Sequence, residues 1–408
     1  MRRRGRGRPV VIVGRDRKAM AAFFSKSGRA RFPGLSAFRL LMLRHLLGRC
    51  AVPLAGILVM LATAPPAVSQ APVVLSGVEC PSCEVRLSHL VTVGAFDGPV
   101  ETGQVISVSL LEDGRYALSS QGSENLISVF AADGRFLMRT GGRGVFGYVR
   151  FLRTHGNSLH VIDPMMRRHT VLSPEFTVVR TARLSVEPLG DVLPVSDSSL
   201  VMSGFVRAAE GPAHLLHVVG PAGGIQQAMA EEPEGVRMDR SPEVYMRALA
   251  PGRGSELFWA AHRTRYRVEE WGVDGVLRRV LVREVPWFPD HRGADDRGPD
   301  EQPLPRIVDV QVDSDDRMWV LIRHGSEEWD ELMGSRPQED REFVMSNLDR
   351  LYTTVIEVID LRSHAVLASS TVDAFLFSFV GDGRVASASS SDGVATTVNI
   401  WDLSILTR

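Results

Sequence analysis

The chain has 408 residues with 47 basic and 48 acidic side chains, but these charges are unevenly distributed. The first 70 residues hold 14 of the basic residues and one acid, so residues 71–408 keep 33 basic and 47 acidic residues, a net charge of −14. Such an acidic domain is a poor nucleic-acid binder, and we expect no nucleic-acid partner. Its basic residues are all arginines, because the lysines are Lys18 and Lys26. Schiff-base chemistry is therefore excluded beyond residue 70.

The N-terminal region has the pattern of an export signal. Residues 42–70 start with Arg44 and Arg49, continue with an apolar core over 51–64, and end with small residues at the spacing of a signal-peptidase site. We interpret residues 1–41 as a basic extension that is untranslated or disordered, with translation starting at Met42 or, alternatively, at Met20. The sequence therefore predicts a periplasmic or secreted protein. The apolar run is short for a membrane span, so only an uncleaved signal would anchor the protein, through residues 50–64.

Two cysteines follow the signal, in the sequence ECPSCE. Cys80 and Cys83 lie in the predicted linker, residues 71–88. In an oxidising compartment this pair is expected to form a small-loop disulfide. A zinc site would need two further ligands from elsewhere in the chain.

Residues 105–141 contain the repeat on which the fold prediction depends. Ile106, Val108 and Leu110 alternate with serines as in a half-buried strand, and similar short runs follow. The turns over 112–115 and 132–135 place Asp-Gly between strands, where glycine adopts the positive φ of a tight hairpin. Four antiparallel strands in about forty residues predict one blade of a β-propeller.

The rest of the chain divides into comparable units. Further blades are expected over 149–184, 191–230, 245–287 and 307–372, and a last blade over 374–402 has three strands. An orphan strand at 89–96 precedes the first blade and could complete the last one, which would remove the open edge of the ring. The sequence thus predicts an all-β, six-bladed propeller over 89–408.

The turns EDGRY, ADGRF, VDGV and GDGR, which begin at Glu112, Ala132, Val273 and Gly381, carry a family resemblance. Through them the region 89–406 resembles the NHL-repeat class of six-bladed propellers. The resemblance implies a propeller architecture and does not by itself imply a reaction.

Loop lengths distinguish the two faces of the predicted disc. All connections between first and second strands, and between third and fourth strands, are short. The long insertions fall on the opposite face, at 231–244, 289–306 and 325–347, and the last of them is expected to contain a short helix over Val344–Leu351. Because scaffolds usually bind through their inserted loops, we predict that this face is functional.

Polar residues at the ends of second strands, and acidic and aromatic residues in the blade-five insertion, are the candidates for ligand contact on that face. These candidates are Asp163, His262, Arg263, Arg323, His324, Glu327 and Trp329. Four residues could instead hold a divalent metal at the mouth of the central channel, since carboxylates and imidazoles are common metal ligands. This alternative set is Asp163, His262, Asp309 and His324.

Two function classes remain open. The first is an exported binding scaffold, without cofactor, that recognises an envelope or extracellular protein, a peptide or a glycan. The second is a metal-dependent enzyme that resembles secreted six-bladed lactonases and related lyases. The absence of a recurrent catalytic motif favours the first class.

Overall fold

The computed structural model describes residues 71–94, 104–121, 126–142, 144–207, 212–232, 241–292, 301–334, 341–381, 383–390 and 396–407. The predicted extension 1–41 and signal peptide 42–70 lie outside these ranges. In the described part of the chain, no helix has the length and apolar character needed to cross a membrane.

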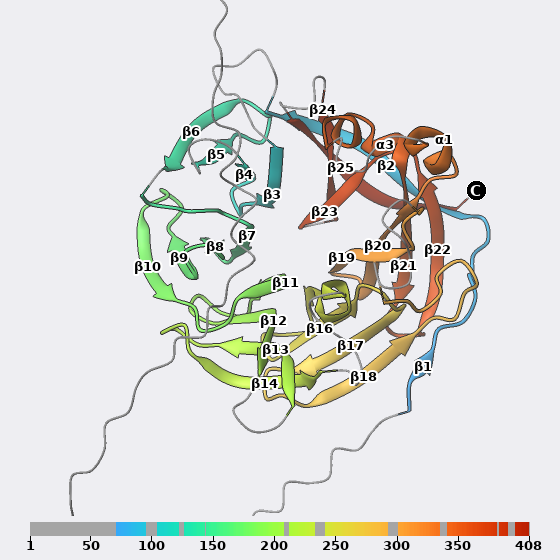
Figure 1. Cartoon of the computed structure of the whole chain (residues 1–408), viewed down its shortest axis with the longest axis horizontal. Coiled ribbons are helices and arrows are strands. Elements are labelled where there is room, and N and C mark those ends of the chain that lie inside the picture. Colours follow the sequence, from blue (N-terminus) through green and yellow to red (C-terminus); the bar gives the residue numbers. More distant parts are fainter. Residues whose placement is uncertain are drawn as a thin grey trace, which may run out of the picture. The chain divides into compact units, whose positions relative to one another are not determined.

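Six antiparallel sheets of four strands follow one another around a ring (Figure 1). Blade one is formed by β3 (Gln104–Leu110), β4 (Tyr116–Gln121), β5 (Leu126–Phe130) and β6 (Phe136–Gly141). Blade two is formed by β7 (Phe151–His155), β8 (Ser158–Asp163), β9 (Arg168–Leu172) and β10 (Val178–Arg183). Blade three is formed by β11 (Pro188–Pro194), β12 (Leu200–Arg207), β13 (Ala213–Val219) and β14 (Ile225–Glu231).

Blade four is formed by β15 (Arg247–Pro251), β16 (Leu257–His262), β17 (Arg267–Gly272) and β18 (Leu277–Val282). Blade five is formed by β19 (Arg306–Val312), β20 (Arg317–Gly325), β21 (Tyr352–Asp360) and β22 (Ala365–Val372). Blade six is formed by β23 (Leu376–Gly381), β24 (Arg384–Ser390), β25 (Thr396–Thr407) and β2 (Cys83–Val93). The predicted six-bladed all-β fold is therefore confirmed.

The Asp-Gly turns form as expected in blade one. Gly114 has φ 83° and Gly134 has φ 86°, values that disfavour residues with a side chain. The Asp113 and Asp133 carboxylates accept hydrogen bonds from the backbone amides two residues later. The hydrophobic residues of the strands pack between neighbouring blades, and the largest such cluster joins blades four and five around Trp259 and Ile322. These apolar layers between blades hold the ring together.

The last blade is closed by the N-terminal strand, as predicted. β2 pairs with β25 from Cys83 opposite Thr407 to Val93 opposite Val398. The strand thus begins at Cys83 and not at His89, inside the predicted linker. A register shift between His89 and Val91 breaks the alternation of apolar residues, which is why the sequence pattern alone did not reveal the first half of the strand. The Cys80–Cys83 disulfide is formed, at the start of β2.

The segment before β2 is also part of the folded unit. β1 (Val73–Val74) runs parallel to β18 as a fifth strand on the outer edge of blade four, and Val78 bridges to Val366 on blade five (Figure 1). Leu75 is buried in the core between these two blades. The segment therefore covers two outer edges before it closes blade six.

The two faces of the disc differ in the way that the sequence predicts. On one face, here called the short-turn face, the described turns within blades are short. The other face, the long-loop face, carries η1 (Pro242–Tyr245) between blades three and four, and three helices between β20 and β21. These are α1 (Trp329–Met333), α2 (Arg341–Ser346) and α3 (Leu348–Leu351). The blade-five insertion is thus helical, in three short pieces.

Candidate functional site at the central channel

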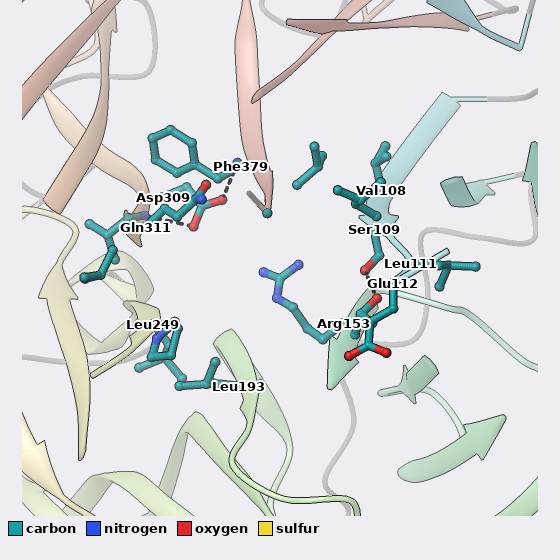
Figure 2. Close-up of a pocket in the computed structure, with 17 residues that line it drawn as sticks. Val108, Ser109, Leu111, Glu112, Arg153, Leu193, Leu249, Asp309, Gln311 and Phe379 are labelled. Carbon is teal, nitrogen blue, oxygen red and sulfur yellow. Dashed lines mark hydrogen bonds between the residues drawn. The ribbon is translucent and has the colours of Figure 1, made fainter. Parts of the chain in front are cut away.

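The six inner strands β3, β7, β11, β15, β19 and β23 surround a central channel, and each contacts the next. At the short-turn end the channel widens into a cavity of about 520 Å³ lined by residues of all six strands (Figure 2). Val108, Leu193, Leu249 and Phe379 supply apolar wall, and the Arg153 side chain projects into the space between them. The cavity is large enough for a small ligand.

Ser109, Thr154 and Arg153 in this cavity already have hydrogen-bond or ion-pair partners. Ser109 and Thr154 share a hydrogen bond of 2.8 Å between their hydroxyls. Arg153 Nη2 lies 2.5 Å from Asp191 Oδ1. A ligand entering from the short-turn end would therefore compete with bonds that already exist, rather than meet donors that lack a partner.

Asp191 and Asp309 join neighbouring inner strands. Asp191 Oδ2 accepts a hydrogen bond from the Leu249 amide of blade four, 3.1 Å away. Asp309 Oδ2 accepts bonds from the Phe379 amide (2.8 Å) and the Ser378 hydroxyl (2.9 Å) of blade six. Burial, together with the charge of Asp191, raises the pKa of Asp309 to about 6. These carboxylates are connections between blades, and their oxygens are already used.

The opposite end of the channel carries an arginine cluster, which we define as Arg150, Arg263, Arg306 and Arg323. They lie at the starts of β7 and β19, at the end of β20 and directly after β16. Arg263 interacts electrostatically with both Arg306 and Arg150. The Ile307 amide donates to the Arg263 carbonyl at 3.0 Å, and Arg306 lies opposite Arg323 across β19 and β20, so these arginines of blades four and five lie close together at the long-loop end.

Three members of the cluster are held by the surrounding protein. Arg306 Nη1 forms an ion pair with Glu243 Oε1 at 2.7 Å. Arg150 Nη2 donates to the Leu189 carbonyl at 3.0 Å. Arg323 is buried, donates to the Leu376 carbonyl at 2.5 Å and stacks on Phe375, with its guanidinium carbon 3.9 Å from the ring centre.

Arg263 is different. Its Nε is buried without a hydrogen-bond partner, and within the described residues its guanidinium has neither a hydrogen bond nor an ion pair. Burial and the charge of Arg306 lower its pKa. Burial, followed by the charges of Arg306 and Arg263, likewise lowers the pKa of Arg323 to about 9. Burial is the main cause of both shifts, and the charges of the neighbouring arginines add to it.

The residues of the predicted metal set are placed in separate networks. Asp163 accepts hydrogen bonds from the amides of Gly147 and Met166 within blade two. His262 Nε2 lies 3.1 Å from Glu269 Oε1. His324 Nδ1 lies 2.7 Å from the Gly325 carbonyl, and Asp309 bonds to blade six as described above. Among the described residues, no group of three or more histidine, cysteine, aspartate or glutamate side chains could hold a metal ion.

The other predicted ligand contacts lie in three different places: on the surface, in the core of the blade-five insertion and in the arginine cluster. Glu327 is exposed at the start of the helical insertion. Trp329 is 4% exposed and packs against Met333 and Leu351, so it forms the core of the insertion. Arg263 and Arg323 are brought together in the arginine cluster.

Sequence reasoning missed Arg150 and Arg306. The signal was available in the strand register, since Arg306 lies opposite Arg323 across β19 and β20.

A second cavity, of about 500 Å³, lies on the long-loop face beside blade five. Its wall includes Trp287, Gln302, Pro303 and His324. Gln302 Nε2 donates to the carbonyls of Gly325 and Ser326 and so ties the blade-five insertion to the preceding loop. The predicted candidate His324 therefore faces a groove, whereas Arg263 and Arg323 belong to the channel.

Comparison with known proteins identifies the fold only. No family model matches the chain, and no curated protein matches it in sequence. Among solved structures, a member of the DUF4221 family from Bacteroides vulgatus is similar, with a TM-score of 0.57 and 10% identity, over 80% of this chain and 99% of that one. This likeness supports the six-bladed propeller architecture and no particular ligand.

Two further structures are similar at lower scores. A candidate exported protein of Bacteroides fragilis has a TM-score of 0.49 and 8% identity, over 81% of this chain and 98% of that one. Virginiamycin B lyase from Staphylococcus aureus has a TM-score of 0.43 and 10% identity, over 78% of this chain and 99% of that one. At these values neither likeness carries a functional argument for this chain.

Proposed function

We propose that the protein is an exported binding scaffold that recognises an envelope or extracellular protein, a peptide or a glycan on its long-loop face. The observation that carries the proposal is the arginine cluster, which lies at the channel end on that face and includes a guanidinium that has no partner among the described residues. Binding sites collect such groups, because donors that the protein leaves unpaired can be paired by a ligand.

The distribution of loops supports the same face. The described connections of the short-turn face are tight turns, whereas η1 and the three helices of the blade-five insertion surround the long-loop end. Trp329, Met333 and Leu351 give the insertion a small apolar core, so it presents a shaped surface. The long-loop face therefore offers both a charged centre and a structured rim.

The metal-dependent lactonase or lyase alternative finds less support. Its four proposed ligands lie in separate hydrogen-bond networks, and the carboxylate oxygens of Asp163 and Asp309 already accept backbone hydrogen bonds.

Export is also part of the proposal. It depends on the signal-like segment at 42–70. The Cys80–Cys83 disulfide supports it, because disulfides are typical of proteins of oxidising compartments.

A comparison of charge-reversal variants on the two faces tests the proposal. The protein is titrated against an array of glycans and envelope-derived peptides, and each hit is measured again with charge-reversed variants. Glu327→Arg and Arg350→Glu alter the long-loop face, whereas Arg278→Glu alters an exposed arginine on the short-turn face. We expect Glu327→Arg and Arg350→Glu each to change the affinity at least about fivefold, and Arg278→Glu to leave it unchanged. Sensitivity to Arg278→Glu alone would overturn the assignment of the face.

A fractionation experiment tests export. The protein is expressed in a bacterial host from Met42, and the extracellular, periplasmic and membrane fractions are compared. We expect a processed form whose N-terminus lies near residue 70 in the periplasm or medium. Retention of the unprocessed chain in the cytoplasm would overturn the export proposal.

A further inference from the structure

Along the central channel, from the cavity to the arginine cluster, the described groups that interact with one another carry more positive than negative charge. The arginine cluster and Arg153 contribute five guanidinium groups, and Asp191, Glu243 and Asp309 contribute three carboxylates. Arg153 is paired with Asp191, and Arg306 with Glu243. The positive charges of Arg263 and Arg323 are therefore not matched by a carboxylate partner of their own.

Leaving an arginine in such a position is costly. A guanidinium carries five N–H donors, and a buried donor without a partner loses the hydrogen bonds that water would supply. Arg263 Nε and Arg323 Nε are both buried, and neither has a hydrogen-bond partner in the part of the chain that the structure describes. An aliphatic side chain at position 263 would not leave a donor unpaired. The presence of an arginine there is explained if a bound ligand accepts its hydrogen bonds.

The geometry of the cluster restricts the chemistry of that group. Arg263 interacts with Arg306 of blade five and with Arg150 of blade two, so a group bound beside it would meet guanidinium donors from more than one blade. Planar guanidinium forks match the oxygens of carboxylate, sulfate and phosphate groups. Neutral acceptors would leave the excess charge unbalanced.

We propose that the arginine cluster binds an oxyanion, namely a carboxylate, sulfate or phosphate group of the ligand, with Arg263 as its principal donor. This inference rests on the proposed function in assigning the ligand to the long-loop face, and it specifies the charge of the ligand. It assigns to Arg323 and Arg150 the role of positioning residues, since each also bonds to a backbone carbonyl.

The test uses the protein as purified after expression from Met42, at low ionic strength. Citrate, sulfate and phosphate are titrated separately by calorimetry, with sodium chloride as the control for ionic strength. The melting temperature is measured in parallel. We expect at least one of the three anions to bind and to raise the midpoint by at least about 2 °C beyond the chloride control. The anion that binds most tightly identifies the group that the site prefers: a carboxylate, a sulfate or a phosphate.

Variants of Arg263 separate binding from a structural role. Arg263→Gln should weaken the anion at least about tenfold. Because it removes an uncompensated charge, it should also melt no lower than the wild type without anion. Arg263→Lys retains the charge without the planar fork and should bind with intermediate affinity. Arg278→Gln, at an exposed pair with Asp274 on the short-turn face, is the matched control and should bind as the wild type.

Three outcomes would overturn the inference. They are no response to any of the three anions, an equal response of wild type and Arg263→Gln, and a clear loss of melting temperature in Arg263→Gln without anion. None of these outcomes affects the assignment of the binding face, because the comparison of charge-reversal variants on the two faces tests that assignment separately. Conversely, the anion could bind as expected while Glu327→Arg and Arg350→Glu leave the binding of glycans and peptides unchanged. This result would support the inference and contradict the proposed macromolecular partner.

Discussion

Arg153 of blade two and Asp191 of blade three form an ion pair of 2.5 Å in the central channel. The same carboxylate accepts hydrogen bonds from the amides of Val192 and Leu249, so it connects three consecutive inner strands. Asp191 is 5% exposed. The channel interior is therefore a structural element of the ring, distinct from the arginine cluster at its long-loop end.

Removing this carboxylate should be costly. Asp191→Ala is expected to lower the free energy of unfolding by at least about 2 kcal/mol, because it leaves the half-buried Arg153 without its ion-pair partner and the Leu249 amide without an acceptor. The measurement is equilibrium denaturation in guanidinium chloride. Asp315→Ala, at an exposed carboxylate of the β19–β20 turn, is the control and should change stability by less than about 1 kcal/mol.

A double variant isolates the pair itself. Arg153→Met combined with Asp191→Asn removes both charges while leaving an acceptor for the amides, and should cost less than the sum of the two single variants. A double variant that costs as much as the sum would show that the two side chains act independently.

The segment before the closing strand should contribute to stability. Leu75 is 6% exposed in the core between blades four and five, whereas its neighbour Val74 is 61% exposed. We expect Leu75→Ala to cost about 2–5 kcal/mol and Val74→Ala to cost within about 0.5 kcal/mol. Denaturation midpoints of the two variants check this directly. Equal effects would mean that the segment is not packed on the ring in solution.

The propeller should lose stability in acid through two buried histidines of blade two. His160 Nδ1 and His169 Nε2 lie 3.0 Å apart, and burial lowers the pKa of His160 to about 4 and that of His169 to about 3. Their pKa in the unfolded chain is higher, near 6.5, so the unfolded state takes up more protons between these values. Stability is therefore complete above pH 6.5 and falls as the pH decreases toward 4.

The size of this effect can be checked by substitution. Each histidine should contribute a loss of about 1.4 kcal/mol per pH unit within that range. In His169→Gln the part due to His169 should disappear, so the stability difference between pH 7 and pH 5 should shrink. Met165→Gln, at an exposed residue of the β8–β9 turn that does not titrate, should keep the pH dependence of the wild type. An unchanged slope in His169→Gln would contradict the assignment.

The disulfide should have a small effect. Cys80 and Cys83 enclose a short loop at the start of β2, and loop-closure entropy predicts a stabilisation of about 2 kcal/mol at most. Unfolding with and without reductant measures it, and Cys80→Ser serves as the variant that cannot re-form the bond. A loss above about 4 kcal/mol would indicate that the disulfide is needed to seat the closing strand.

Much of the fold could be predicted from the sequence because each blade repeats the same local pattern. Alternating apolar residues and Asp-Gly turns located the strands of blade one, and the missing fourth strand of the last blade pointed to closure from the N-terminus. The start of β2 at Cys83 could not be predicted in this way, since the shift between His89 and Val91 interrupts the alternation.

The site was less accessible from sequence. Arg263 and Arg323 were selected because they end second strands, but the local pattern gives no information on which blades face each other across the channel. His262 and His324 were selected by the same rule and lie in other networks. Arg150 and Arg306 begin inner strands, and their relevance appears only when the ring closes and brings blades two, four and five to one axis.

The most direct test of the oxyanion site is the location of an anion in crystals of the protein soaked in sodium selenate, by anomalous diffraction from selenium. We predict a peak within hydrogen-bonding distance of the Arg263 guanidinium, on the axis at the long-loop end, which disappears in Arg263→Gln. Selenate only at exposed arginines of the surface, or none near Arg263 in crystals that bind it elsewhere, would contradict the account.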